Sequence, residues 1–201
     1  MTNESSIDYS KPVGEIVRGS ISNFETQCHQ LYETPALGSL VVSRDVTTTY
    51  GIVCEITTQS LDPTRQVRAL GKNEDTVEQV YQQNPQLNQL LTTEFRSIVV
   101  GHKESSEIRY HLAPTPPRIH SFVYFCDKNT LTEFSRSLTF IQVLLSSEFV
   151  SNDDVIASFI HQASVTQQDQ ELFLINAGKE LAKLLNGQLP RLNSLLRRLS
   201  K

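Results

Sequence analysis

Residues 35–56 carry the clearest pattern of apolar and polar positions in the chain, two apolar runs separated by a polar turn. The runs at residues 40–42 and 52–54 closely follow Gly38 and Gly51. β-Branched side chains favour a pleated backbone because their χ1 angle is already restricted, and glycine supplies a bend or a close approach. The pattern therefore predicts a strand–turn–strand hairpin that seeds a small β-barrel.

Other segments alternate apolar and polar residues or carry short apolar runs, which is typical of strands. Together with the hairpin they predict a barrel of six or seven antiparallel strands. The additional predicted barrel strands are residues 13–21, 24–32, 66–70, 95–100 and 108–112, and a last apolar run at 119–126 predicts a strand beyond the barrel domain.

A helical insertion is expected at about residues 73–92. Asn73 can cap a helix whose first turn contains Glu74 and Asp75, where acidic residues favour the positive end of the helix dipole. Pro85 ends this helix, and leucines beyond it predict one more helical turn.

Three prolines interrupt the pattern at Pro114, Pro116 and Pro117. Proline removes a backbone donor and fixes φ, so this segment is neither helix nor central strand and is the best domain boundary. The predicted organisation is a flexible leader at 1–11, a β-barrel domain at 12–113, a proline-rich linker at 114–118, and a strand plus α-helical domain at 119–201.

The pattern after residue 129 is helical, with apolar residues three and four positions apart. Gly187 is a natural helix stop, and Pro190 suits the first turn of a last helix. The predicted fold class is α+β, an N-terminal antiparallel β-barrel followed by a C-terminal α-helical bundle. Capping boxes predict helix starts at Thr130 with Glu133, Ser151 with Asp154, and Thr166 with Asp169.

Charge is distributed unevenly along the chain. The net charge is −4, but residues 179–201 carry six basic groups and one acid, so the remaining residues sum to −9. The tail is thus the candidate surface for an anionic partner, although a basic amphipathic helix can equally be a solvated face packed on its own bundle. The candidate contacts are Arg191, Arg197, Arg198 and Lys201.

Three widely spaced cysteines, Cys28, Cys54 and Cys126, suit a reducing compartment better than a disulfide framework. The polar start has no secretory pattern, and no apolar run is long enough to span a membrane. We therefore expect a cytoplasmic protein.

Four short motifs stand out along the chain, namely VGEIV at 13–17, LGSLVV at 37–42, YGIV at 50–53 and TPPRIH at 115–120. They resemble the HAS barrel, the β-barrel at the N-terminus of HerA-type DNA-translocating ATPases, which is similar to the N-terminal barrel of rotary ATP synthase subunits. The resemblance covers about residues 12–125 and implies a docking function, because in those ATPases this barrel forms the crown of a ring and docks partners.

The chain departs from that family after the barrel. HerA continues with a RecA-like domain that carries a phosphate-binding loop, whereas about 75 mostly helical residues follow here. Neither Gly71-Lys72 nor Gly178-Lys179 fits that loop, because Ser or Thr does not follow the lysine and the first glycine is missing. The resemblance therefore implies a barrel without its motor, and no family catalytic residue matches a position in this sequence.

Catalytic and metal-binding patterns are weak. His102, His111 and His120 are nine residues apart, without the close pairs that are typical of zinc sites. Cys54 or Cys126 with His120 is a conceivable nucleophilic pair, but both cysteines lie in apolar runs, where a thiol stays protonated. We expect no catalytic, cofactor-binding or metal-binding residue.

The leading hypothesis is a non-catalytic interaction or assembly module that docks a HerA-like ATPase or a related protein, or that forms a homo-oligomer. The alternative is a nucleic-acid-associated accessory factor in DNA processing that uses the basic C-terminal helix. An enzyme is the third hypothesis, and the missing motifs argue against it.

Overall fold

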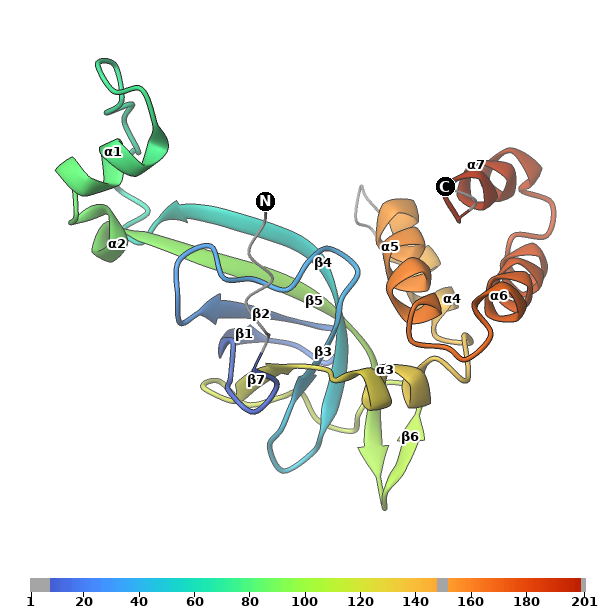
Figure 1. Ribbon diagram of the computed structural model, residues 1–201. Coiled ribbons are helices and arrows are strands. Elements are labelled where there is room, and N and C mark those ends of the chain that lie inside the picture. Colours follow the sequence, from blue (N-terminus) through green and yellow to red (C-terminus); the bar gives the residue numbers. More distant parts are fainter. Residues whose placement is uncertain (1–7, 148–151, 200–201) are drawn as a thin grey trace.

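The computed structural model describes residues 8–147 and 152–199 and contains a closed, six-stranded antiparallel β-barrel (Figure 1). The strands follow one another in the order β2-β1-β7-β3-β4-β5, and pairing of β2 with β5 closes the barrel. A seventh strand, β6, extends β5 as a hairpin. The strands are β1 (Gly14–Gly19), β2 (Asn23–Cys28), β3 (Leu40–Ser43), β4 (Thr49–Ser60), β5 (Leu91–Glu104), β6 (Glu107–Arg109) and β7 (Phe122–Phe125).

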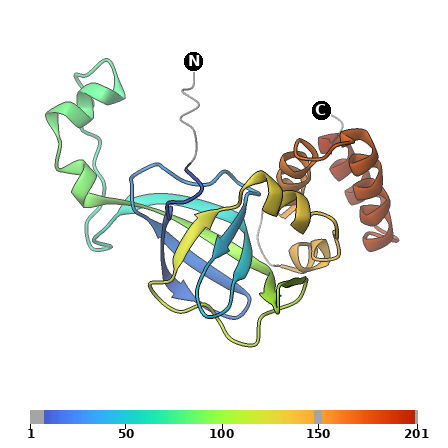
Figure 2. The ribbon, with the colours of Figure 1, turned by 60° about the horizontal axis from the view of Figure 1, so that its bottom comes forward.

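The helices lie in two places. Two short helices sit at the far end of the long β4–β5 ribbon, away from the barrel, and the later helices gather on the opposite side (Figures 1 and 2). They are α1 (Val77–Gln83), α2 (Leu87–Leu90), α3 (Lys128–Phe134), α4 (Ile141–Ser146), α5 (Asn152–Ser164), α6 (Gln170–Leu184) and α7 (Leu189–Leu199).

Two hydrophobic cores lie on opposite faces of the same strands. The barrel interior is filled by one face, which includes Val41, Val53 and Val99. The outer face of β3, β4 and β5 packs against the C-terminal helices. Strands that are buried on both faces need continuous apolar runs, which explains the strongly apolar sequences at residues 40–42 and 52–54.

Gly38 allows α5 to approach the barrel closely. Its φ is +77°, and a Cβ there would lie 2.6 Å from Cβ of Ser158, so any side chain would clash. Ser39 Oγ donates to Gln162 Oε1 over 2.9 Å, and Gln162 Nε2 donates to the Leu37 carbonyl over 2.9 Å. The helical part is therefore tied to the entrance of β3.

The predicted strands overlap strands of the structure except at residues 66–70, which form no strand, so that prediction was wrong. The strand predicted at 108–112 corresponds to β6, which lies outside the closed barrel. Residues 66–70 lie in the excursion between β4 and β5, where no strand of the described residues completes a ladder with them. Barrel and helices also do not follow each other simply along the chain. The helices α1 and α2 lie between β4 and β5, and β7 comes after the prolines at 114–117 yet lies between β1 and β3. The predicted domain boundaries stay a prediction.

Three predicted helix starts were misplaced. Thr76, not Asn73, caps α1, in a capping box with Gln79. The other two caps are aspartates, Asp127 for α3 and Asp169 for α6, whose carboxylates accept the N–H three residues further on. A carboxylate at this position satisfies a free amide as well as a hydroxyl does, so both residue types compete for the cap.

The long helix expected after residue 129 is broken into α3 and α4, because residues 135–140 turn between them. Gly187 has a φ of +83°, as the predicted helix stop requires. The predicted cap Ser151 lies outside the described residues.

Candidate functional site

The basic tail folds back onto acidic residues of its own bundle. Arg191 Nη2 lies 2.8 Å from Oδ1 of Asp153, and Arg198 forms an ion pair with Asp154. Both aspartates belong to the first turn of α5, and Leu192 and Leu195 of α7 are buried in the helical core.

Of the four predicted anion contacts, the structure thus places two in ion pairs within the chain. Arg197 lies beside Arg198 in the last turn of α7, and Lys201 lies outside the described residues. An anionic partner would have to compete with Asp153 and Asp154. Binding by the tail stays a prediction.

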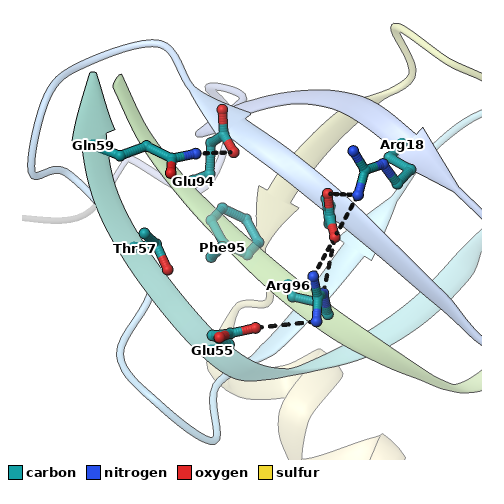
Figure 3. Close-up of a pocket in the computed structure, with 8 residues that line it drawn as sticks. Arg18, Glu55, Thr57, Gln59, Glu94, Phe95 and Arg96 are labelled. Atoms are coloured by element: carbon teal, nitrogen blue, oxygen red, sulfur yellow. Dashed lines mark hydrogen bonds and ion pairs between the residues drawn. The ribbon is translucent and has the colours of Figure 1, made fainter. Parts of the chain in front are cut away.

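A cleft of about 260 Å³ lies on the barrel surface over β1, β2, β4 and β5 (Figure 3). Arg96 stands at its centre, with Nε 2.9 Å from Oε1 of Glu25 and Nη1 3.1 Å from Oε2 of Glu55. Arg18 contacts the other oxygen of Glu25 at 3.3 Å. These residues form a cross-strand charge ladder, which we define as Arg18, Glu25, Arg96 and Glu55.

The charge ladder is nearly neutral and internally satisfied. Hydrogen bonding to Glu25 raises the pKa of Arg96, so the guanidinium stays charged. Glu25 is largely buried, with 16% of its side chain exposed, and is held by two arginines. Both oxygens of Glu25 are therefore occupied by guanidinium partners within the chain. The ladder was not predicted, because only the register of four strands brings these residues together.

A second polar cluster surrounds Glu15 and Asp45. Glu15 accepts from His120 Nδ1 at 3.0 Å and His29 Nε2 at 3.3 Å, and these bonds lower its pKa. Asp45 accepts from Arg118 and from Ser121, and the bond from Arg118 holds the pKa of Asp45 well below its usual range. The adjoining cleft, of about 280 Å³, is lined by Arg44, Asp45, Arg118, Ile119, His120, Ser121 and Phe122.

The three evenly spaced histidines do not meet at one site, although the rings of His102 and His111 are in edge contact, with centroids 5.0 Å apart. His102 is buried, and its Nδ1 lies 3.1 Å from the carbonyl oxygen of His111, whereas His120 belongs to the cluster around Glu15. In the parts of the chain that the structure describes, no three His, Cys, Asp or Glu side chains are grouped so that they could hold a metal ion.

The cysteines are held in their thiol form. Burial raises the pKa of Cys28, Cys54 and Cys126 to about 12. A protonated thiol is a weak nucleophile. This agrees with the expectation that thiols in apolar runs stay protonated.

Residues 61–90 form a projecting arm at the end of the β4–β5 ribbon (Figure 1). None of these residues is buried, and α1 and α2 contribute nothing to either core. The hydroxyl groups of Tyr81 and Tyr32 hydrogen-bond, which ties α1 to the loop after β2. The arm nevertheless exposes several large apolar side chains, namely Leu61, Val67, Leu70, Val77 and Leu90.

The closed antiparallel barrel agrees with the barrel expected from the HAS resemblance. No protein-family model matches the chain, and no curated protein matches it. Membership of the HAS-barrel family therefore stays a prediction. None of the described helices has the length and apolar character needed to cross a membrane.

Proposed function

We propose that this protein is a non-catalytic interaction or assembly module, which docks a protein partner through the arm of residues 61–90. The HAS resemblance makes a HerA-like ATPase the first partner to test. The observation that carries the proposal is that a segment of this length exposes large apolar side chains without burying a single residue.

The arm has the composition of a docking surface. Exposed apolar side chains gain free energy when a partner covers them, and grouped apolar residues with polar neighbours mark interaction sites. In its middle part, basic Arg68 and Lys72 precede acidic Glu74 and Asp75, whereas Arg65 forms an ion pair with Asp62. A partner surface of complementary charge would therefore bind it in one orientation.

A non-catalytic role is supported by the state of the reactive groups. The carboxylates of Glu25, Glu15 and Asp45 are engaged by basic side chains, and the thiols are protonated. Catalytic acids and bases need a pKa close to the working pH, whereas the pKa values of Glu15 and Asp45 are lowered by their partners and the pKa of the Cys54 thiol is raised by burial.

The test removes the arm while keeping the barrel. The N–H of Leu61 donates to the carbonyl of Leu90, so these residues form a hydrogen-bonded pair across the ribbon, and a two-residue Asn-Gly turn can replace residues 62–89. Binding of a purified HerA-type ATPase is measured by calorimetry for the full chain and for the shortened chain. We expect binding by the full chain and at least a tenfold loss without the arm.

A matched control changes an apolar residue that is exposed elsewhere. Val46 lies in the turn between β3 and β4 and is 86% exposed, so Val46→Ser should leave binding unchanged. Equal binding with and without the arm would refute docking through it. The proposed function would be refuted if the full chain bound neither the ATPase nor any protein that is cross-linked to arm residues in cells.

A further inference from the structure

The outer edge of β4 is unpaired beyond the barrel. β3 pairs with β4 only up to Ile52, whereas β5 continues to pair with β4 as far as Ser60. Within residues 8–147 and 152–199, no strand lies along the other side of residues 55–60. We call residues 55–60 the far edge, and Figures 1 and 2 show this part of β4 leading from the barrel to the arm.

Backbone groups of the far edge alternate in direction. The N–H of Leu61 donates to the carbonyl of Leu90, so it points toward the β5 side. The register with β5 is unbroken over residues 55–60, and successive residues of a strand direct their backbone groups to opposite sides. Every second residue of the far edge therefore presents an N–H and a C=O outward. These residues are Ile56, Thr58 and Ser60.

The far edge lacks the usual protection against strand pairing. Exposed edges are commonly blunted by lysine or proline, and the sequence EITTQS contains neither. Its single charge, on Glu55, is already engaged by Arg96 at 3.1 Å. An extended chain can replace water along such a row of outward N–H and C=O groups, because its own backbone groups alternate with the same spacing.

We propose that the far edge pairs with the same edge of a second copy of this chain, antiparallel about a two-fold axis at Thr58. This inference rests on the proposed assembly function and assigns it a surface and a partner. The two β4–β5 ribbons then form one continuous sheet, and their clefts lie on the same face of it.

The direction of the backbone groups fixes the register. Outward-facing residues must lie opposite one another, so Thr58 pairs with Thr58 and Ile56 pairs with Ser60 of the second copy. This arrangement makes about six inter-chain hydrogen bonds. Between these pairs, Thr57 lies opposite Gln59.

A second copy fits because the edge is complementary to itself. Threonine pairs are favourable across strands, and like charges opposite each other are not. In this register Glu55 lies opposite Leu61 and far from the other Glu55, so the two carboxylates do not repel. A two-fold axis also closes the assembly at a dimer, because each far edge is then covered by the other.

Sedimentation velocity over about 5 to 500 µM protein tests the proposal, because a short strand pair gives a modest affinity. We expect the wild-type mass to rise from monomer to dimer across this range. Thr58→Pro removes an outward N–H that the monomer does not use, so this variant should stay a folded monomer. Thr58→Val is its matched control and should dimerise as the wild type does.

A charge pair tests the register and does not depend on the proline. Ile56→Lys with Ser60→Lys places like charges opposite each other at both ends, and we expect the dimer Kd to rise about tenfold or more. Ile56→Lys with Ser60→Glu places opposite charges there and should restore dimerisation. Circular dichroism checks that each variant is folded.

Two results would overturn the self-pairing. One is a wild-type mass that stays monomeric at the highest concentration, and the other is a dimer that the double-lysine variant and Thr58→Pro form as well as the wild type does. Neither result touches docking through the arm, which the shortened chain tests separately. Loss of ATPase binding without the arm, together with a monomeric wild type, would retain the proposed function and reject this inference.

Discussion

The two halves of β4 differ in almost every respect except their pairing with β5. All residues from 49 to 54 are buried, whereas residues 55–59 are exposed. We call residues 49–54 the near half of β4. There, Ile52 packs against the helices, and Val53 packs in the barrel interior. In the far edge, Glu55, Thr57 and Gln59 line an open cleft (Figure 3).

This difference separates stability from recognition within one strand. The near half is held by two cores, so its side chains are fixed by packing. The far edge is held by its ladder with β5 and by the charge ladder, and its outer side remains open. The part of the strand that the fold needs least is the part that we propose pairs with a second copy of the chain.

The largest expected effect comes from a matched pair of isoleucines in β4. Ile52→Ala leaves a cavity between β4 and the helices, and we expect it to lower the free energy of unfolding by about 2–5 kcal/mol. Ile56→Ala, at a residue that is 40% exposed, should cost less than about 1 kcal/mol. Urea unfolding measures both. Equal costs would remove the distinction between the two halves.

A smaller effect is expected from the charge ladder that supports the far edge. Arg96→Ala leaves Glu25 largely buried beside one remaining, exposed arginine, so we expect a loss of about 1–3 kcal/mol. Arg18→Ala is the control, because 77% of that side chain is exposed, and it should cost less than about 1 kcal/mol. Similar costs for the two variants would show that the ladder does not support the ribbon.

Alkaline pH probes the boundary between the halves, where Cys54 lies. Burial raises the pKa of this thiol to about 12, while in the unfolded chain it ionises near its ordinary value of 9.0. The unfolded state therefore releases protons first, and stability falls as pH rises from about 9 toward 12. Urea midpoints at pH 8 to 10.5 should decline, and Cys54→Ala should make the decline less steep. An unchanged slope in Cys54→Ala would show that the thiol is not shielded.

The smallest effect is expected at the basic tail, a rival surface to the far edge. Because Asp153 and Asp154 already engage Arg191 and Arg198, we expect only weak nucleic-acid binding at about 150 mM salt. Arg197→Glu with Arg198→Glu should then change gel-shift titrations little. Tight, salt-dependent binding that this variant abolishes would instead favour the nucleic-acid alternative.

The near half shows why part of the fold follows from sequence. Its apolar runs fit few structures other than a strand covered on both faces, so the hairpin and the barrel were predicted correctly. The far edge escaped prediction because Thr57, Thr58 and Gln59 suit a loop as well as a strand. Only pairing with β5 makes them a strand.

The candidate surfaces depend even more on tertiary structure. The charge ladder joins Arg18, Glu25, Glu55 and Arg96 from strands whose register no local pattern reveals. The tail was recognised from its charge, but its pairing with Asp153 required the packing of α7 against α5. Local capping signals likewise failed where threonine and aspartate compete for one helix start.

Hydrogen exchange of individual backbone amides tests the central claim most directly. The N–H of Val53 donates to the carbonyl of Ser39, so it should exchange slowly at every concentration. The amides of Ile56, Thr58 and Ser60 should exchange rapidly in dilute protein and slow down at about 500 µM, when the edges pair. Slow exchange of these three amides in dilute protein, or rapid exchange at all concentrations, would contradict an open edge that serves for assembly.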